Sequence, residues 1–176
     1  MADDEAGGVS ALRATAHPVR LRMLSLLTGT AMSAAEVARE LGITHANASY
    51  HLRLLLDADE LVEAGEEKIR GGVAKRYRHP HERTRRATST PATADERVHS
   101  VRAAGAEAER RIRDRVDGPG TFSDLEGWVD PATWERAVAL LTQASHLLHD
   151  ANRAPRTDGT IHVSMTSIAF RMGPGA

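Results

Sequence analysis

The fold is decided by residues 33–55, which read SAAEVARELGITHANASYHLRLL. Ser33 is a favourable helix N-cap, and Glu36 three residues later supplies the other half of a capping box. The apolar residues that follow share one helical face: Val37, Ala38 and Leu41. Gly42 then predicts the end of this helix, because glycine adopts the left-handed conformation common after a helix C-terminus.

A second helix is predicted directly after this glycine. Thr44 can cap it, and its apolar residues recur at intervals of four and three: Ala48, Leu52 and Leu55. Two helices joined by a short turn that contains glycine, the second opening on small polar residues, are typical of a helix-turn-helix.

The flanking sequence extends this motif on both sides. His17-Pro18 places a proline in the first turn of an apolar helix that ends at Gly29. On the other side, Gly71-Gly72 separates two short extended segments and predicts a β-hairpin. A helix-turn-helix followed by a hairpin rich in Lys and Arg predicts a winged helix, a mainly α fold with a small β-hairpin wing (α+β).

The charge of the chain is unevenly distributed, although the net charge of its 176 residues is only -1. Residues 1–67 carry 5 basic and 11 acidic side chains, whereas residues 68–86 carry eight Lys or Arg against the single acid Glu82. A block with a local net charge of +7 attracts polyanions, because charges farther away than ~8 Å are screened at physiological salt. The alternative is a solvated basic loop, because most runs of like charge are simply exposed to solvent.

Composition excludes several classes of function. The chain has no cysteine, so disulfides and thiolate metal sites are excluded. Two Trp, two Tyr and two Phe are too few for a platform that stacks single-stranded nucleic acid, so a nucleic-acid partner is expected to be duplex. No apolar run approaches the ~20 residues that span a bilayer, and the acidic start is unlike a secretory leader. We therefore expect a cytoplasmic protein without membrane contact.

Beyond the hairpin, the sequence predicts a linker and a mainly helical C-terminal region. Helices are predicted over 94–116 and, from the N-cap Asp130, over 131–152. The second helix carries an apolar seam near coiled-coil spacing, formed by Trp134, Val138, Leu141 and Leu148. Residues 160–170 alternate in polarity and predict a terminal strand. The expected organisation is a disordered tail (1–9), a winged helix-turn-helix (10–82), a linker (83–93) and a C-terminal dimerisation or effector region (94–176).

The predicted second helix of the motif has a polar face opposite its apolar stripe, since each residue advances ~100° around the axis. That face and the N-terminal tip are formed by Thr44, His45, Ala46, Asn47, Ser49, Tyr50 and Arg53. These residue types suit the major groove of DNA, where Asn pairs with adenine and Arg with guanine or a phosphate. His51 lies at the margin of the stripe and suits either the core or a phosphate contact.

The hairpin supplies the candidate phosphate contacts, which are Lys68, Arg70, Lys75, Arg76 and Arg78. Because alternate residues of a strand point to opposite faces, about half of them are expected to reach DNA.

Several segments resemble ArsR-type winged-helix transcriptional regulators. Residues 16–24 (AHPVRLRML) are similar to the opening helix of that family, and residues 35–43 (AEVARELGI) and 48–53 (ASYHLR) to its helix-turn-helix. The SYHLR form, together with GWVDP at 127–131, is closer to the actinobacterial branch with a C-terminal extension than to the short metal sensors. The resemblance implies a regulator that binds a double-stranded DNA operator. We expect a homodimer and favour repression, since no separate activating surface is identifiable.

The chain departs from the family pattern twice. The family usually has a short turn with glycine before the wing, whereas residues 56–60 (LDADE) are one residue longer and lack glycine. The cysteine metal box of the best-known members is also absent, so arsenic or cadmium sensing through thiolates is excluded.

Histidines offer the alternative of a metal-responsive repressor. His146 and His149 have the i, i+3 spacing that suits Zn or Ni, but the neighbouring Leu147 and Leu148 favour ordinary histidines on a partly buried helix. We therefore expect neither a metal nor another cofactor. A winged helix that binds a protein instead of DNA is the other alternative.

Catalysis and effector binding have weaker support. Ser49, His51 and Asp57 lie on one helix without the strained turn of a catalytic serine, so no enzyme is expected. A cavity for an apolar effector of unknown identity could be lined in the C-terminal region by Trp128, Trp134, Met165 and Phe170. The favoured interpretation is that these four side chains fill the core.

Overall fold

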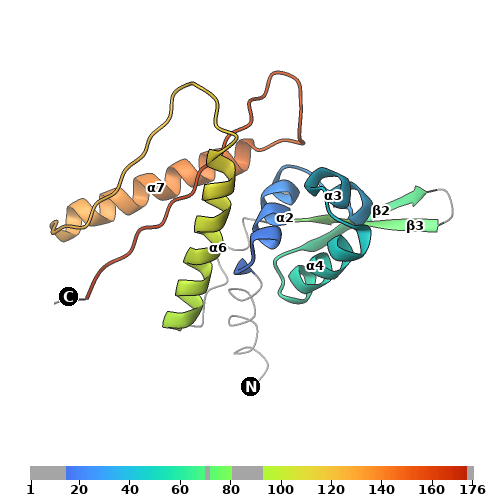
Figure 1. Cartoon of the computed structure of the whole chain (residues 1–176), viewed down its shortest axis with the longest axis horizontal. Coiled ribbons are helices and arrows are strands. Elements are labelled where there is room, and N and C mark those ends of the chain that lie inside the picture. The colour runs from blue at the N-terminus through green and yellow to red at the C-terminus, as the bar shows by residue number, and fades with distance from the viewer. Residues whose placement is uncertain (1–14, 70–71, 81–92, 174–176) are drawn as a thin grey trace.

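The computed structural model describes residues 15–69, 72–80 and 93–173. Its elements in chain order (Figure 1) are α2 (Pro18–Gly29), β1 (Met32–Ser33), α3 (Ala34–Leu41), α4 (His45–Asp57), β2 (Val62–Ile69), β3 (Gly72–Arg78), α6 (Ala94–Ile112) and α7 (Pro131–Ala151). Helices α2, α3 and α4 gather at the base of the β2–β3 hairpin, which points away from α7. The predicted tail at 1–9, and the predicted linker apart from Thr93, lie outside the described residues.

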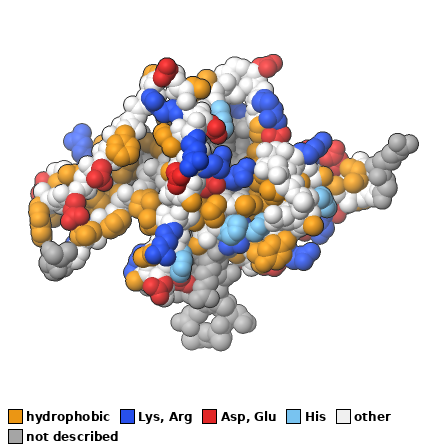
Figure 2. Space-filling view, in the orientation of Figure 1, with side chains coloured by type: hydrophobic (Ala, Val, Ile, Leu, Met, Phe, Trp, Pro, Cys, Tyr) orange, Lys and Arg blue, Asp and Glu red, His pale blue; other side chains and the backbone are white. Residues whose placement is uncertain are grey.

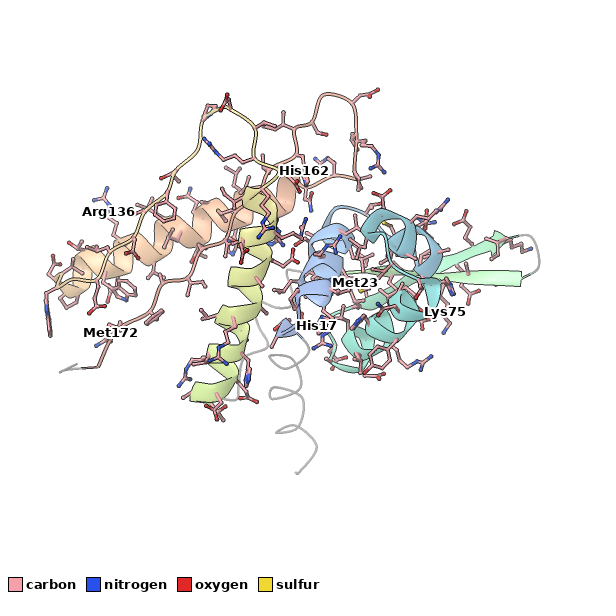
Figure 3. The ribbon with its side chains drawn as sticks, in the orientation of Figure 1. His17, Met23, Lys75, Arg136, His162 and Met172 are labelled. Atoms are coloured by element: carbon pink, nitrogen blue, oxygen red, sulfur yellow. The ribbon has the colours of Figure 1, made fainter. Side chains whose placement is uncertain are left out.

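The apolar core of the described residues lies between α2, α3 and α4. Met23 and Leu27 of α2, Val37 of α3 and Leu55 of α4 are fully buried. Met23, labelled in Figure 3, lies where these helices meet. Each such side chain contributes about 1.5–3 kcal/mol relative to an exposed one. This core contains no residue of α7, so the three helices form a packed unit without that helix.

The predicted helix ends of the helix-turn-helix are confirmed. The Ser33 hydroxyl accepts a hydrogen bond from the Glu36 N–H, and the Glu36 carboxylate accepts one from the Ser33 N–H at 2.7 Å. Gly42 ends α3 in the left-handed region, with a φ of 65°. Thr44 caps α4, since its hydroxyl accepts from the Asn47 N–H at 3.2 Å. These bonds satisfy N–H groups that have no partner within the helix.

The turn from α4 into the wing is made by Asp59 in place of a glycine. Asp59 has a φ of 57°, in the left-handed region that glycine adopts freely and Asp tolerates better than most residues. The N–H groups of Asp59 and Glu60 donate to the carbonyls of Leu56 and Leu55, at 3.0 and 2.9 Å. The longer turn without glycine therefore still connects α4 to β2.

The wing belongs to a three-stranded antiparallel sheet of order β1-β3-β2. Ile69 pairs with Gly72 at the tip, which confirms the predicted hairpin. β1 contributes only two residues, and its Ser33 lies opposite Arg76 of β3. The short strand therefore joins the wing to the N-terminus of α3. The described chain is an α+β structure with a winged helix, as predicted.

The two predicted C-terminal helices are present. Helix α6 begins at the N-cap Thr93 and packs on α2, and it ends at Ile112 rather than Val116. Helix α7 begins after the N-cap Asp130 with Pro131 at its first position, as predicted. None of the described helices has the length and apolar character needed to cross a membrane.

The end of the chain differs from the prediction. Residues 160–170 form no strand, and they run back along α7 with most of their apolar side chains exposed (Figure 1). A strand requires neighbouring backbone for its hydrogen bonds, and the described part of the chain offers none here.

The expected C-terminal core is also absent. Trp128 is 92% exposed and Phe170 is 64% exposed, so these residues do not fill a core within one chain. Met165 is 37% exposed and Trp134 is half-buried. The physical reason is that α7 buries no residue against the rest of the described chain, so no second layer covers these side chains.

Candidate nucleic-acid interface

Helix α4 presents a polar strip to solvent. Its stripe of Ala48, Leu52 and Leu55 is buried against the core. The exposed residues of the opposite face and of the N-terminal tip are His45, Ala46, Asn47, Tyr50 and Arg53, with Ser49 half-buried at the edge. Thr44 is exposed, but one acceptor site of its hydroxyl is occupied by the helix cap. The exposed groups are an imidazole, an amide, a phenol and a guanidinium, which are able to bind base edges and phosphates.

His51 faces α2 rather than solvent. It is 7% exposed, and its ring centroid lies 4.8 Å from that of His17. The Tyr50 ring meets it edge-on at 5.2 Å. Its Nδ1 atom is buried without a hydrogen-bond partner. Of the two roles predicted for His51, this geometry favours packing between α2 and α4.

His17 is a neighbour of α4 that sequence reasoning did not single out. Its Nδ1 accepts a hydrogen bond from the Val19 N–H at 3.2 Å and so caps α2. Burial lowers the pKa of His17, and the charge of Arg20 lowers it further. Burial also lowers the pKa of His51, with contributions from His17 and Arg20. In both imidazoles the folded structure therefore favours the neutral form. The sequence signal for His17 is its position before Pro18, where a helix cap is expected.

The wing carries charges of both signs. Lys68 and Arg78 are exposed and make no ion pair within the described residues. Lys75, labelled in Figure 3, donates to Glu63 at 2.7 Å, and this bond raises the pKa of Lys75. Arg70 lies outside the described residues. Arg78 lies at the base of the wing, where it pairs with Val62 and lines a hollow with Gly29 and Arg153, so Lys68 is the described wing cation best placed to meet a phosphate.

Arg76 is situated differently from the other wing cations. It is half-buried and forms ion pairs with Glu36 of α3 and Glu67 of β2. Burial acts to raise the pKa of Glu36, but hydrogen bonds from Ser33, together with Arg76 and Arg39, outweigh burial and hold that pKa below its usual value. Glu36 is therefore a charged carboxylate that both caps α3 and binds the wing.

The candidate metal ligands on α7 do not meet a third ligand. Among the described residues, no three His, Asp or Glu side chains converge as a metal site requires. His149 Nδ1 lies 2.7 Å from the Ser145 carbonyl. His146 lines a hollow of about 250 Å³ between α7 and the terminal segment, near Ser167 and Ala169. None of the four predicted effector walls lines this hollow.

The C-terminal end of α7 is attached to the helix-turn-helix. The Asn152 side chain donates to the Ser25 carbonyl of α2 at 3.1 Å, and Arg156 forms an ion pair with α3. Backbone of Arg153 also passes close to Gly29: a Cβ on Gly29 would lie 2.5 Å from the Arg153 carbonyl oxygen. Glycine at position 29 therefore permits a contact between segments far apart in sequence.

Comparison with known proteins agrees with this geometry. A family model described as a helix-turn-helix domain, from a family that includes ArsR-type regulators, matches residues 15–63. The match spans α2, α3, α4 and the first residues of β2. No curated protein matches the chain. Residues 15–63 therefore form a helix-turn-helix domain, the part of the chain in which the exposed strip of α4 lies.

Proposed function

We propose that the chain is an ArsR-type regulator of transcription that binds double-stranded DNA in a sequence-specific manner. In this proposal α4 enters the major groove and the wing contacts the adjacent phosphates. The observation that carries the proposal is the exposed polar strip of α4, held on a matched helix-turn-helix that is followed by a wing with the exposed cation Lys68. Helix-turn-helix domains commonly have this role, and they are typically not enzymes.

The proposed organisation follows the chain. Residues 10–82 bind DNA and residues 94–176 mediate dimerisation, with residues 83–93 as the linker between these two regions. We further propose that the protein acts in the cytoplasm as a repressor that blocks access of polymerase to the operator.

The proposed homodimer is supported by the C-terminal region. Helix α7 buries no residue in the described chain, and its seam residues Val138, Leu141 and Leu148 are between 36% and 41% exposed. Figure 2 shows hydrophobic side chains gathered over α7 and the segments beside it. A two-fold partner would cover this surface, and it would offer residues 160–170 a neighbouring strand. Two copies would also present two α4 helices to two half-sites.

Selection of duplexes from a random library, followed by fluorescence anisotropy, tests DNA binding by the full chain. We expect the selected duplex to bind at least about 10³-fold more tightly than unrelated duplexes. Arg53→Ala should weaken that binding by roughly 1–3 kcal/mol. Arg136→Ala, which removes an exposed arginine of α7 away from α4 (Figure 3), is the matched control and should leave the affinity unchanged. Equal, weak binding to every duplex even at low salt contradicts the proposal.

Sedimentation equilibrium tests the homodimer. We expect twice the chain mass of 19.0 kDa for the protein and a monomer for Leu141→Glu, which puts a charge into the apolar seam. Gln143→Glu adds the same charge on another side of α7 and should stay dimeric. A wild-type chain that remains at 19.0 kDa at micromolar concentration contradicts the dimer without affecting the DNA-binding proposal.

A winged helix that contacts a protein is the second candidate, favoured by the acids of the wing. β2 contains Glu63, Glu66 and Glu67, and two of them pair with wing cations. The variant Lys68→Ala separates the two functions. If the wing binds DNA, the variant binds more weakly, and the slope of log binding constant against log salt concentration becomes shallower by about 0.9 for each phosphate contact removed. If the wing binds a protein, neither quantity changes.

A further inference from the structure

Arg76 occupies the junction between the wing and the first helix of the helix-turn-helix. Its Nη2 donates to the Ala31 carbonyl at 2.5 Å, in the segment before β1. Its Nη1 lies 3.2 Å from the Glu36 carboxylate of α3 and 2.5 Å from the Glu67 carboxylate of β2. One guanidinium on β3 therefore contacts three other segments.

We infer that Arg76 is a positioning residue that fixes the wing on α3, not one of the phosphate contacts of the proposed DNA interface. The inference rests on the proposed function and adds that the wing cations have two roles, with Arg76 positioning the wing and exposed cations contacting phosphates.

The charges around Arg76 support this role. Two carboxylates face one guanidinium, so a DNA phosphate would have to displace a carboxylate and add negative charge where it is already in excess. The Arg76 side chain is only 27% exposed, whereas that of Lys75, its neighbour in sequence, is 53% exposed. Alternate residues of a strand point to opposite faces, so Lys75 and Arg76 lie on different faces of the wing.

The geometry of the guanidinium explains why this position suits arginine. Its planar fork of donors can serve several acceptors at once, which the single ammonium of lysine does less well. The β1–β3 ladder adds only two residue pairs, one of them Ser33 with Arg76 itself. Such a short ladder holds the wing weakly on its own. The side-chain bonds of Arg76 therefore add a connection on the α3 side, while Tyr77 packs on the core and the His79 N–H donates to the Leu27 carbonyl of α2.

The two roles predict opposite effects of removing the partner acid. If Arg76 bound phosphate, Glu67→Gln would release the guanidinium and strengthen DNA binding. If Arg76 positions the wing through Glu67, the same variant weakens binding. Glu66→Gln is the matched control, because Glu66 is an exposed neighbour on β2 that lies opposite Lys75 and makes no ion pair with Arg76. Its affinity shows how much DNA binding strengthens when any one carboxylate near the DNA is removed.

The experiment measures anisotropy of the full chain on its selected duplex at two salt concentrations. We expect Glu67→Gln to bind roughly threefold more weakly than Glu66→Gln, within the range of exposed ion pairs. We also expect Arg76→Ala/Glu67→Gln to bind no more weakly than Arg76→Ala alone. Binding by Glu67→Gln as tight as, or tighter than, that of Glu66→Gln overturns the inference.

A second measurement does not depend on DNA. Hydrogen exchange of backbone amides in residues 72–79 should be accelerated about threefold or more by Arg76→Ala and unchanged by Arg78→Ala, whose side chain makes no ion pair in the described residues. Equal exchange in the two variants overturns the inference, even if the wild-type chain binds no duplex. Failure of the wild-type chain to prefer any duplex, with faster exchange in Arg76→Ala, instead counts against the proposed function alone.

Discussion

Asp59 occupies a backbone conformation that costs a residue with a Cβ roughly 1–2 kcal/mol. Glycine avoids this cost but loses more entropy on folding, so the two effects partly cancel. We expect Asp59→Gly to raise the free energy of unfolding by about 0.5–1 kcal/mol, measured by urea denaturation. The variant also removes the charge that, after burial, raises the pKa of Glu60.

Two controls separate these causes. Asp59→Asn removes the charge and keeps the strained backbone, so any increase in its free energy of unfolding is electrostatic. Asp57→Gly places glycine at the last residue of α4 and should destabilise the protein. A loss of stability in Asp59→Gly would show that the left-handed turn is not strained.

The histidines between α2 and α4 make stability depend on pH. Their pKa values are lowered in the folded chain, so the unfolded chain binds protons first as the pH falls below the ordinary value of 6.5. The stabilisation is therefore complete above that value and is lost as the pH falls toward the lower folded pKa values. We expect urea denaturation to show decreasing stability from roughly pH 7 to pH 5.5, with a smaller decrease in His51→Gln. The same slope in both proteins would assign the pH dependence to other groups.

At the scale of the element, the ends of α3 and α4 depend on chemistry within a few residues. We expect Ser33→Ala to destabilise the protein by about 1 kcal/mol, because it removes the cap of α3 and a hydrogen bond to the Glu36 carboxylate. Ser25→Ala is the control. Its hydroxyl donates to a carbonyl one turn earlier in α2, so the change should be within about 0.5 kcal/mol. Equal effects in thermal denaturation would contradict a special role for the cap.

The same locality explains what the sequence could predict. The capping box of Ser33 and Glu36, the left-handed Gly42 and the cap Thr44 are each encoded within four residues, and all three are present. The partners of Arg76 come from α3, from β2 and from the segment before β1, whereas composition alone suggested a phosphate contact. Residues 160–170 have the polarity pattern of a strand, but a pattern does not supply the neighbouring backbone that a strand requires. The phosphate and base contacts of α4 and the wing remain predictions.

At the scale of the whole molecule, Gly29 allows the segment that follows α7 to approach the end of α2 closely. A Cβ at this position would lie 2.5 Å from a backbone oxygen, so Gly29→Ala must displace the segment at Arg153. We expect trypsin to cleave after Arg153 and Arg156 several-fold faster in this variant, because local release exposes the backbone to the protease.

Gly105→Ala is the matched control for this prediction. Gly105 lies within α6, and a Cβ there meets nothing within 4 Å. The substitution should stabilise α6 by about 1 kcal/mol through helix propensity and leave cleavage after Arg153 unchanged. Identical cleavage rates in the two variants would show that the contact at Gly29 does not hold the C-terminal region in place.

The uncovered apolar side of α7 affects how the proposed repressor would respond to its own abundance. If two molecules must associate before they bind an operator, the concentration of the active dimer rises with the square of the chain concentration while monomers predominate. Halving the chain count, as one round of cell division without new synthesis does, would then leave about a quarter of the active species. A gene under such control is released steeply by dilution, and no signalling molecule is required.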